Sequence, residues 1–187
     1  SSKNHIDHHK GNFAGAGKMS TPETPVVYVD ENGVMDPAAV EVLKLMAEKD
    51  VVLGTGHGTA WEIDHLVEKA LEVGVKRILV NHPQFHIGAT YEQMTKWANL
   101  GAYIEMNVCV FTSGSRMGSL DDQVIADMLK AVPLERLILD SDMGQRGNGS
   151  PVEGMYRFIR LLMDKFGLSE ADIDLIAKKN PAALLGV

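Results

Sequence analysis

Short apolar runs alternate with amphipathic stretches through most of the chain. Each of four runs is almost wholly apolar until its last residues, and the stretch after it has apolar positions at helical spacing. Nearly continuous apolar strands that alternate with helices are typical of a parallel sheet covered by helices. The pattern therefore predicts an α/β fold with strands at 50–56, 77–83, 102–110 and 136–142 and helices at 60–74, 91–101 and 120–132. Two architectures fit it: an open doubly wound sheet or part of a (β/α) barrel.

The two ends of the chain depart from this repeat. Residues 1–25 are rich in Gly, Ser, Thr, Pro and His without sustained periodicity, and we expect a polar loop or arm there. A helix is expected after Asp36, which can cap it, because Pro37 would occupy the first helical position. Residues 152–187 predict two or three helices. We therefore expect residues 26–187 to form one domain.

Polar side chains gather where the predicted strands end. His57, His82 and Asn107 follow one another at intervals of 25 residues, and Asp142 ends the fourth strand. Side chains alternate along a strand, so each group is expected on the same face of its strand as the residues two and four positions before it. Ligands bind outside the carboxyl ends of parallel strands, so these side chains are expected around one mouth. The glycines of 54–58 (GTGHG) would let a substrate or metal approach His57 closely.

The chemistry of these groups points to a divalent metal. Imidazole and carboxylate ligands suit zinc, manganese or iron, and we expect zinc. We predict His57, His82 and Asp142 as metal ligands, and His82 and Asp142 as catalytic residues. The structural alternative is that a strand-end histidine is only hydrogen-bonded and that the aspartate caps a turn. Recurrence of these groups at equivalent positions of successive units favours the functional interpretation.

Four further positions near the strand ends carry weaker signals. Glu105 and Asn107 could support the ligands, contact substrate, or simply fill the interior of a barrel. Asp140 lies deeper in its strand, and we expect a structural role. Cys109 lacks a neighbouring nucleophile motif and is expected to be buried.

A cluster of histidines near the start of the chain is a second metal candidate. His5, His8 and His9 would share one face of a helix, and Asp7 could join them. The surrounding composition is loop-like, which favours substrate-facing loop residues or an exposed arm instead.

Composition and charge narrow the class of partner. The formal net charge is -7, and no block of Lys and Arg is present that could neutralise a row of phosphates, so nucleic acid is not expected. No apolar run approaches the roughly 18 residues of a membrane-spanning helix, and no secretory signal is evident, so we expect a cytoplasmic protein. The single cysteine excludes an intramolecular disulfide and a cysteine zinc cage. A small-molecule substrate remains the expected partner.

Five segments carry a resemblance to a known family. They resemble the C-terminal half of the metal-dependent amidohydrolase superfamily, and in particular a branch of predicted metal-dependent hydrolases: VVLGTGH, VKRILVNHP, GAYIEMN, LILDSDMGQ and KKNPAALLGV. The resemblance covers about residues 50–187 and implies a (β/α)8 TIM barrel that holds one or two divalent metals at its carboxyl rim. It implies that His57 and His82 match the histidines of the fifth and sixth strands. Asp142 would match the aspartate of the eighth strand, which is both ligand and proton shuttle.

The chain departs from that family at its start. The His-x-His pair of the family's first strand is absent, about four strands are countable, and 187 residues are few against the ~250 of such a barrel. We therefore expect the C-terminal portion of a TIM barrel of amidohydrolase type, with the N-terminal strands missing. Such a half barrel would expose two sheet edges, so a homo-oligomer is expected.

The expected function is a metal-dependent hydrolase that acts on a small-molecule amide, lactone or related C–N or C–O bond through metal-activated water. Two alternatives stay open: a metal-dependent decarboxylase on the same barrel, or a noncatalytic half-barrel remnant that acts as a binding or assembly module.

Overall fold

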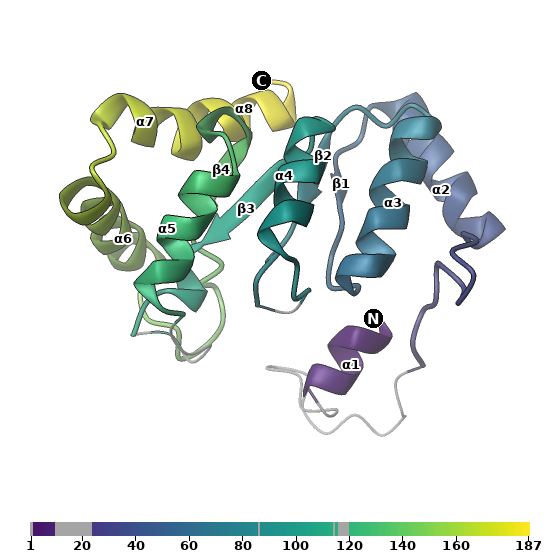
Figure 1. Cartoon of the computed structure of the whole chain (residues 1–187), viewed down its shortest axis with the longest axis horizontal. Helices are drawn as coiled ribbons and strands as arrows, with labels where there is room; N and C mark the ends of the chain where they lie inside the picture. The colour runs from purple at the N-terminus through teal and green to yellow at the C-terminus, as the bar shows by residue number, and fades with distance from the viewer. Residues whose placement is uncertain (1, 10–23, 86, 114, 116–119) are drawn as a thin grey trace.

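A four-stranded parallel sheet organises the chain (Figure 1). The computed structural model describes residues 2–9, 24–85, 87–113, 115 and 120–187. The strands lie in chain order as β1 (Leu53–Gly54), β2 (Ile78–Val80), β3 (Tyr103–Asn107) and β4 (Leu137–Asp140). The prediction of an α/β fold with a parallel sheet is confirmed. Each strand is shorter than its apolar run.

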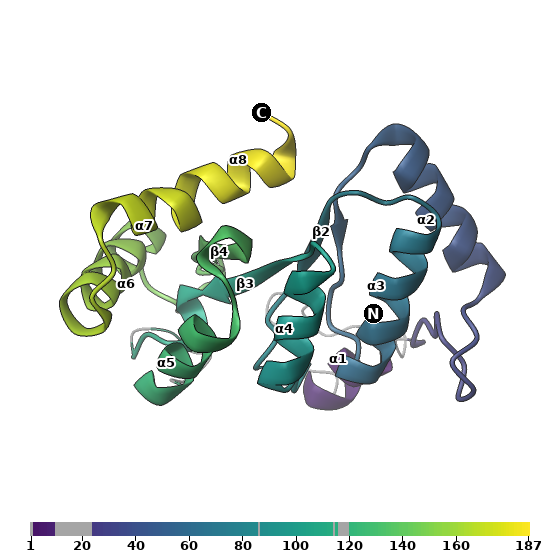
Figure 2. The same cartoon turned by 45° about the horizontal axis from the view of Figure 1, so that its top comes forward.

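Three helices cover one face of this sheet. They are α3 (Ala60–Glu72), α4 (Tyr91–Asn99) and α5 (Asp122–Ala131), and they lie toward the viewer in Figure 1. The helix α2 (Pro37–Lys49) packs against α3 at the β1 side of the sheet (Figure 2). The predicted helix after each of the first three strands is therefore confirmed.

The C-terminal helices lie at the β4 side. They are α6 (Pro151–Phe166), α7 (Glu170–Asp174) and α8 (Asn180–Leu185), with a π-helical turn at Leu175–Lys179 between the last two. Asn180 fixes this segment to the start of β4, because its Nδ2 donates to the carbonyls of Leu134 and Leu137, both at 2.7 Å. No helix in the described part of the chain is long and apolar enough to cross a membrane.

Local capping sets where the helices begin. Thr59 and Glu62 form a capping box at the start of α3, and Thr90 and Gln93 form another at the start of α4. Asp36 caps α2 as expected, through the backbone N–H of Ala38. Because the N-cap Thr59 lies two residues after His57, it fixes one end of the loop that carries this histidine.

The strand register separates an apolar face from a polar one. The partners Leu53 and Ile78, and then Ile104 and Leu137, lie on the helix-covered face and are buried. They join the buried helix residues Ile63, Val67, Met94, Trp97, Ile125 and Met128 in one core. The opposite face carries buried or half-buried polar groups near the strand ends, namely Glu105, Asn107 and Asp140.

The start of the chain differs from expectation. Lys3–His9 forms the helix α1 where the sequence indicated a loop or arm, while residues 10–23 of that segment lie outside the described residues. Seven residues are too few for a helix that is stable in isolation. Tertiary contacts supply the support, because Ser2 and Asn4 donate hydrogen bonds to the backbone that follows β1.

Candidate active site at the carboxyl end of the sheet

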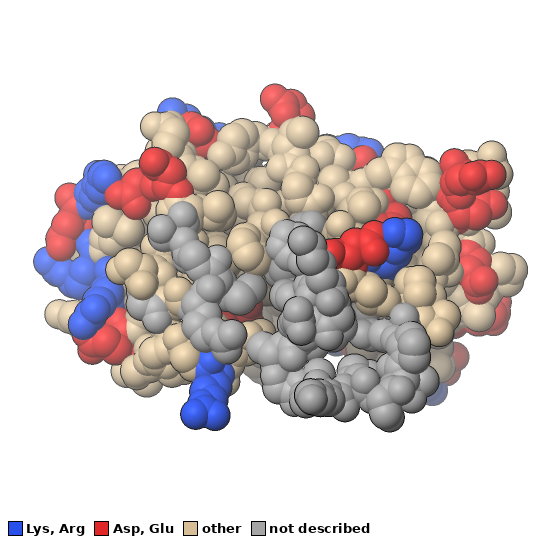
Figure 3. Space-filling model, turned by 90° about the horizontal axis from the view of Figure 1, so that it is seen from below, with Lys and Arg blue, Asp and Glu red and all other residues tan. Residues whose placement is uncertain are grey.

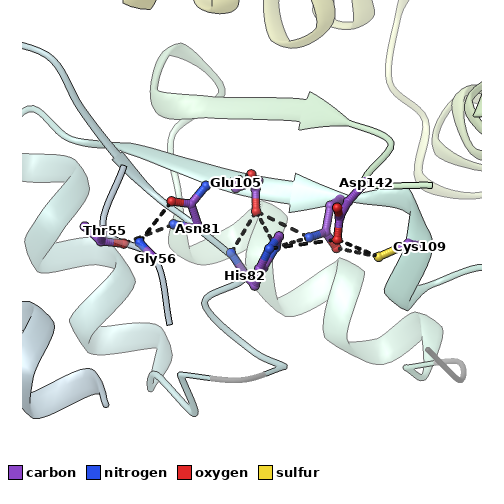
Figure 4. A network of polar contacts seen from close by, with 8 residues as sticks. Thr55, Gly56, Asn81, His82, Glu105, Cys109 and Asp142 are labelled. Carbon is purple, nitrogen blue, oxygen red and sulfur yellow. Dashed lines mark hydrogen bonds and ion pairs between the residues drawn. The ribbon is translucent and has the colours of Figure 1, made fainter. Parts of the chain in front are cut away.

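His82 lies between two carboxylates that come from different strands (Figure 4). Its Nδ1 is 2.5 Å from Glu105 Oε2, and its backbone N–H donates to the same oxygen at 2.8 Å. Its Nε2 faces Asp142 Oδ2 at 3.8 Å. The two ring nitrogens are thus directed at two different acids.

Left-handed backbone conformations orient the side chains of both His82 and Asp142. Their φ angles are 42° and 43°, and the one other non-glycine residue with positive φ in the described chain is Asp50, which ends α2. Such angles are uncommon outside glycine, and they cluster at functional sites. They also correct the simple alternation expected from the sequence. His82 would otherwise share the helix-covered face of Ile78 and Val80, but its ring meets Glu105 of the opposite face.

Asn81 ties the exit of β1 to Glu105. Its Nδ2 donates to Glu105 Oε1 at 3.0 Å, and its Oδ1 accepts the backbone N–H of Gly56 at 3.2 Å. Its own N–H donates to Thr55 Oγ1 at 3.2 Å. Sequence reasoning missed this residue, although its place one residue before His82 in a strand exit was the available signal.

Asn107 closes the other side of Glu105. Its Nδ2 donates to Glu105 Oε2 at 3.3 Å and also contacts Nδ1 of His82. Both residues are buried, with exposed fractions of 5% for Glu105 and 2% for Asn107. The structure therefore places this pair in contact with a predicted ligand, which supports a positioning role over filling the interior.

The carboxyl groups of this cluster are held in opposite protonation states. Burial alone would raise the pKa of Glu105, but the hydrogen bond and charge of His82, with contacts from Asp140, lower it to about 2. Burial and the negative charge of Glu105 raise the pKa of Asp140 to about 9. With the pKa of Glu105 lowered and that of Asp140 raised, we assign the ionised form to Glu105 and the protonated form to Asp140.

The charge on Glu105 acts in turn on His82. Burial alone would lower the pKa of the imidazole, but the hydrogen bond and charge of Glu105, followed by the charge of Asp142, raise it. The pKa values of Glu105 and Asp140 are shifted in opposite directions, which is a common feature of acid pairs in catalytic centres.

His57 brings a second imidazole to the cluster. Its ring centroid lies 5.0 Å from that of His82, with an angle of 31° between the planes. The ring of His5 stacks on His57 at 4.4 Å and 13°. The sequence singled out His5, but its loop-like surroundings gave no reason to place it beside His57. Side chains of His8 and His9 lie outside what the structure describes.

Cys109 lies behind Asp142. The thiol is buried, as expected, and Sγ donates to Asp142 Oδ2 at 3.3 Å. Burial, followed by the charge of Asp142, raises the pKa of the thiol. The cysteine is therefore a neutral hydrogen-bond donor to Asp142.

The structure places His82 beside each of the other two residues that the sequence singles out as ligands. His57, His82 and Asp142 come from three separate strand exits and meet at one end of the sheet. Within the described ranges, no three His, Cys, Asp or Glu side chains form a ready-made group that could hold a metal ion. The ligand roles of these residues therefore stay predictions.

The surface at this end of the molecule is mixed in charge. Figure 3 shows this end of the molecule from below, and at its left, on the side of α6 in Figure 1, blue Lys and Arg side chains lie among red Asp and Glu side chains.

Comparison with known proteins gives a family but no activity. A search of curated proteins found no match. Residues 1–105 match the "Family of unknown function (DUF6282)". The matched segment is more than half of the chain, and it includes His5, His57, His82 and Glu105. The chain therefore belongs to the family of unknown function DUF6282.

Proposed function

We propose that this chain is a metal-dependent hydrolase that acts on a small-molecule amide, lactone or related C–N or C–O bond. One observation carries the proposal: His57, His82 and Asp142 converge at the carboxyl end of a parallel sheet, with His82 held by a buried glutamate. This is where parallel α/β enzymes bind their ligands.

The strand order supports the barrel of amidohydrolase type. A doubly wound sheet reverses its strand order at the point where its ligand binds. The order β1-β2-β3-β4 has no such reversal, and right-handed crossovers between successive neighbours put α3, α4 and α5 on one face. We therefore propose that the four strands are the C-terminal portion of a (β/α)8 barrel.

The donor groups fit a divalent metal. Histidine ligands usually donate their other ring N–H to a carboxylate, which fixes the tautomer and the ring orientation. Glu105 contacts Nδ1 of His82, which leaves Nε2 facing Asp142. His82 and Asp142 would hold the ion, and His57 would be the third ligand. This nitrogen and oxygen set favours zinc, with manganese or iron as alternatives.

A bound divalent ion supplies a water of lowered pKa and polarises the bond to be broken. The remaining steps fall to residues of this chain. Asp142 accepts the proton of the attacking water on its carboxylate and then donates it to the leaving group. Cys109 holds one oxygen of that carboxylate through its thiol. Glu105 keeps His82 in one tautomer and orientation throughout.

The metal content and the hydrolytic activity of the purified protein test this proposal. We expect stoichiometric zinc by elemental analysis and turnover of one or more members of a panel of small amides and lactones. Asp142→Asn and His82→Asn should lower turnover by about 10²-fold or more, whereas the matched controls Asp164→Asn and His65→Asn should retain it. Asp164 pairs with Arg160 on the surface, and His65 contacts the carbonyl of Trp61 on α3.

Two other results would overturn the proposal. Release of carbon dioxide without incorporation of water would indicate a decarboxylase. Absence of bound metal together with unchanged behaviour of the site variants would indicate a noncatalytic binding module.

A further inference from the structure

The helix α1 docks on the loop that carries His57. Ser2 Oγ donates to the carbonyl of His57 at 2.7 Å, and Asn4 Nδ2 donates to the same carbonyl at 3.0 Å. Asn4 Nδ2 also lies 3.3 Å from the carbonyl of Gly58. Figure 1 shows α1 below the connection between β1 and α3, at the carboxyl end of the strands. Two side chains thus fix two successive peptide groups of this loop.

A ring contact extends this docking to the side chain of His57. The imidazole of His5 lies almost parallel to that of His57, with centroids 4.4 Å apart and 13° between the planes. The ring of His57 also neighbours that of His82, and the centroids of these two rings are 5.0 Å apart. The ring of His5 therefore limits the rotation of the ring that approaches His82.

The loop that carries His57 is built from conformationally permissive residues. Glycine flanks His57 on both sides, and Gly56 has a φ of 64°, with no atom of the described residues within 4 Å of the position that a Cβ would occupy. Glycine gives the backbone access to more conformations than any other residue. The hydrogen bond from Gly56 N to Asn81 and the cap of α3 fix the two ends of the loop. The carbonyl and the ring of His57 are fixed from α1.

We propose that α1 is a clamp for His57 and that His5 is a positioning residue of the site. In this proposal Ser2 and Asn4 fix the backbone of the glycine-flanked loop, and the face of the His5 ring fixes the plane of the His57 ring. The orientation of His57 beside His82 is the property that the clamp controls. The chemical use of that orientation rests on the proposed hydrolase function, but the clamp itself does not.

Stacking and metal ligation make different demands on position 5. Stacking uses the ring face, so a phenyl ring can replace the imidazole. Ligation needs a ring nitrogen, which phenylalanine lacks. His5→Ala removes both features, His5→Phe removes the nitrogens alone, and Asn4→Ala removes the backbone contacts of that side chain. Lys3→Ala serves as the control, because Lys3 pairs with Asp7 on the exposed part of α1.

Two measurements on the full chain test the clamp. The first is the nuclear Overhauser contact between the ring protons of His57 and His82 in metal-free protein. The His57→Asn variant assigns the His57 ring signals, because they are absent from its spectrum. The second is the dissociation constant for Zn²⁺ by calorimetry. We expect His5→Ala to lose the ring contact and to bind Zn²⁺ about tenfold more weakly, as variants of residues that support ligands do. His5→Phe and Lys3→Ala should keep both properties, and Asn4→Ala should weaken both.

The outcomes are distinct. An intact ring contact in His5→Ala would overturn the clamp. Loss of the contact in His5→Phe as well as in His5→Ala would overturn the role of stacking. Wild-type protein that binds no Zn²⁺ would count against the proposed hydrolase, and the ring contact would still decide the clamp. Far-ultraviolet circular dichroism of each variant separates these effects from loss of the fold.

Discussion

One oxygen of Glu105 meets His82 at two points: Oε2 lies 2.5 Å from the ring Nδ1 and 2.8 Å from the backbone nitrogen. The same oxygen thereby fixes both the ring and a peptide group that has a left-handed φ of 42°. A buried carboxylate in this position selects one tautomer of the imidazole and one conformation of the turn after β2.

Glu105→Gln is expected to weaken metal binding without unfolding the protein. The amide keeps the volume but loses the negative charge. Donors face both carboxylate oxygens, Asn81 at Oε1 and His82 and Asn107 at Oε2, so the NH2 group would face a donor in either orientation. We expect the dissociation constant for Zn²⁺ to rise by about 10- to 100-fold. Calorimetric titration measures this change. Glu153→Gln, on the exposed part of α6, is the control, and an equal loss there would count against a specific role of Glu105.

Asp142→Asn is expected to impair turnover far more than stability. The side chain is 40% exposed, so the folded state loses little when its charge is removed. Loss of the proton acceptor should lower kcat by about 10²- to 10⁴-fold on the best substrate of the panel. Comparison of kcat with the midpoint of urea unfolding checks both parts. A variant with wild-type kcat would remove Asp142 from the mechanism.

Gly58→Ala is expected to disturb the loop after β1. A Cβ at Gly58 would collide with the hydroxyl of Tyr28, which is buried and has no hydrogen-bond partner among the described residues. Overpacking of this kind costs about 1–3 kcal/mol. Urea unfolding should show that loss in Gly58→Ala, and the double variant with Tyr28→Phe should recover part of it. Failure to recover would place the strain elsewhere in the loop.

Asp64 is expected to make stability depend on pH in the acid range. Its carboxylate accepts Trp97 Nε1 at 2.7 Å and Lys96 Nζ at 3.1 Å, which joins α3 to α4. Burial would raise the pKa of Asp64, but the hydrogen bonds of Gln93, Lys96 and Trp97 lower it below the ordinary value. A lowered pKa in the folded state stabilises the protein above the unfolded-state pKa of about 3.9, and this stability is lost as the pH falls through the folded-state pKa.

Asp64→Asn tests that dependence. At pH 6 the variant should be less stable than wild type by about 1 kcal/mol, since the charged carboxylate that accepts hydrogen bonds from three donors becomes a neutral amide. The difference should shrink as the pH is lowered below about 4. Urea unfolding at pH 6 and pH 3 measures it. A difference that stays constant between these pH values would contradict the assignment, and Asp164→Asn provides the surface control.

Self-association is expected of the chain in solution. In the described part of the chain, β1 and β4 are the two edges of the sheet, and each pairs with one strand. Unpaired strand edges favour association with a second copy. Light scattering should give about twice the chain mass of 20.4 kDa. A monodisperse monomer would contradict this expectation.

The order of the apolar runs predicts much of the fold, but it does not predict the orientation of the side chains in the site. A capping residue such as Asp36 acts on its own helix, so the sequence could predict the start of α2. Strand ends were overestimated because pairing depends on a partner: β1 is limited to the stretch where Leu53 N and Thr55 N donate to carbonyls of the β2 segment. Apolar composition carries no information about that limit.

The hydrophobic pattern could not predict the left-handed turn at His82 or the docking of α1 on the His57 loop. Alternation along β2 assigns the His82 side chain to the wrong face of the sheet. The side chain lies on the opposite face because His82 has a positive φ, which is uncommon outside glycine and is not visible in the hydrophobic pattern. The helix α1 forms in a segment of loop-like composition because its partner, the His57 carbonyl, is more than 50 residues away in the chain. Such contacts are set by tertiary packing, which outweighs local propensity.

The parallel sheet brings the groups of this cluster from four successive strand exits: His57 follows β1, His82 follows β2, Glu105 lies on β3 and Asp142 follows β4. Each β-α unit thus contributes its own functional groups, and exchange of a single connecting loop can change the groups of one unit while the strands of the other units keep their places. A scaffold divided in this way can change its chemistry by small steps, without rebuilding its core.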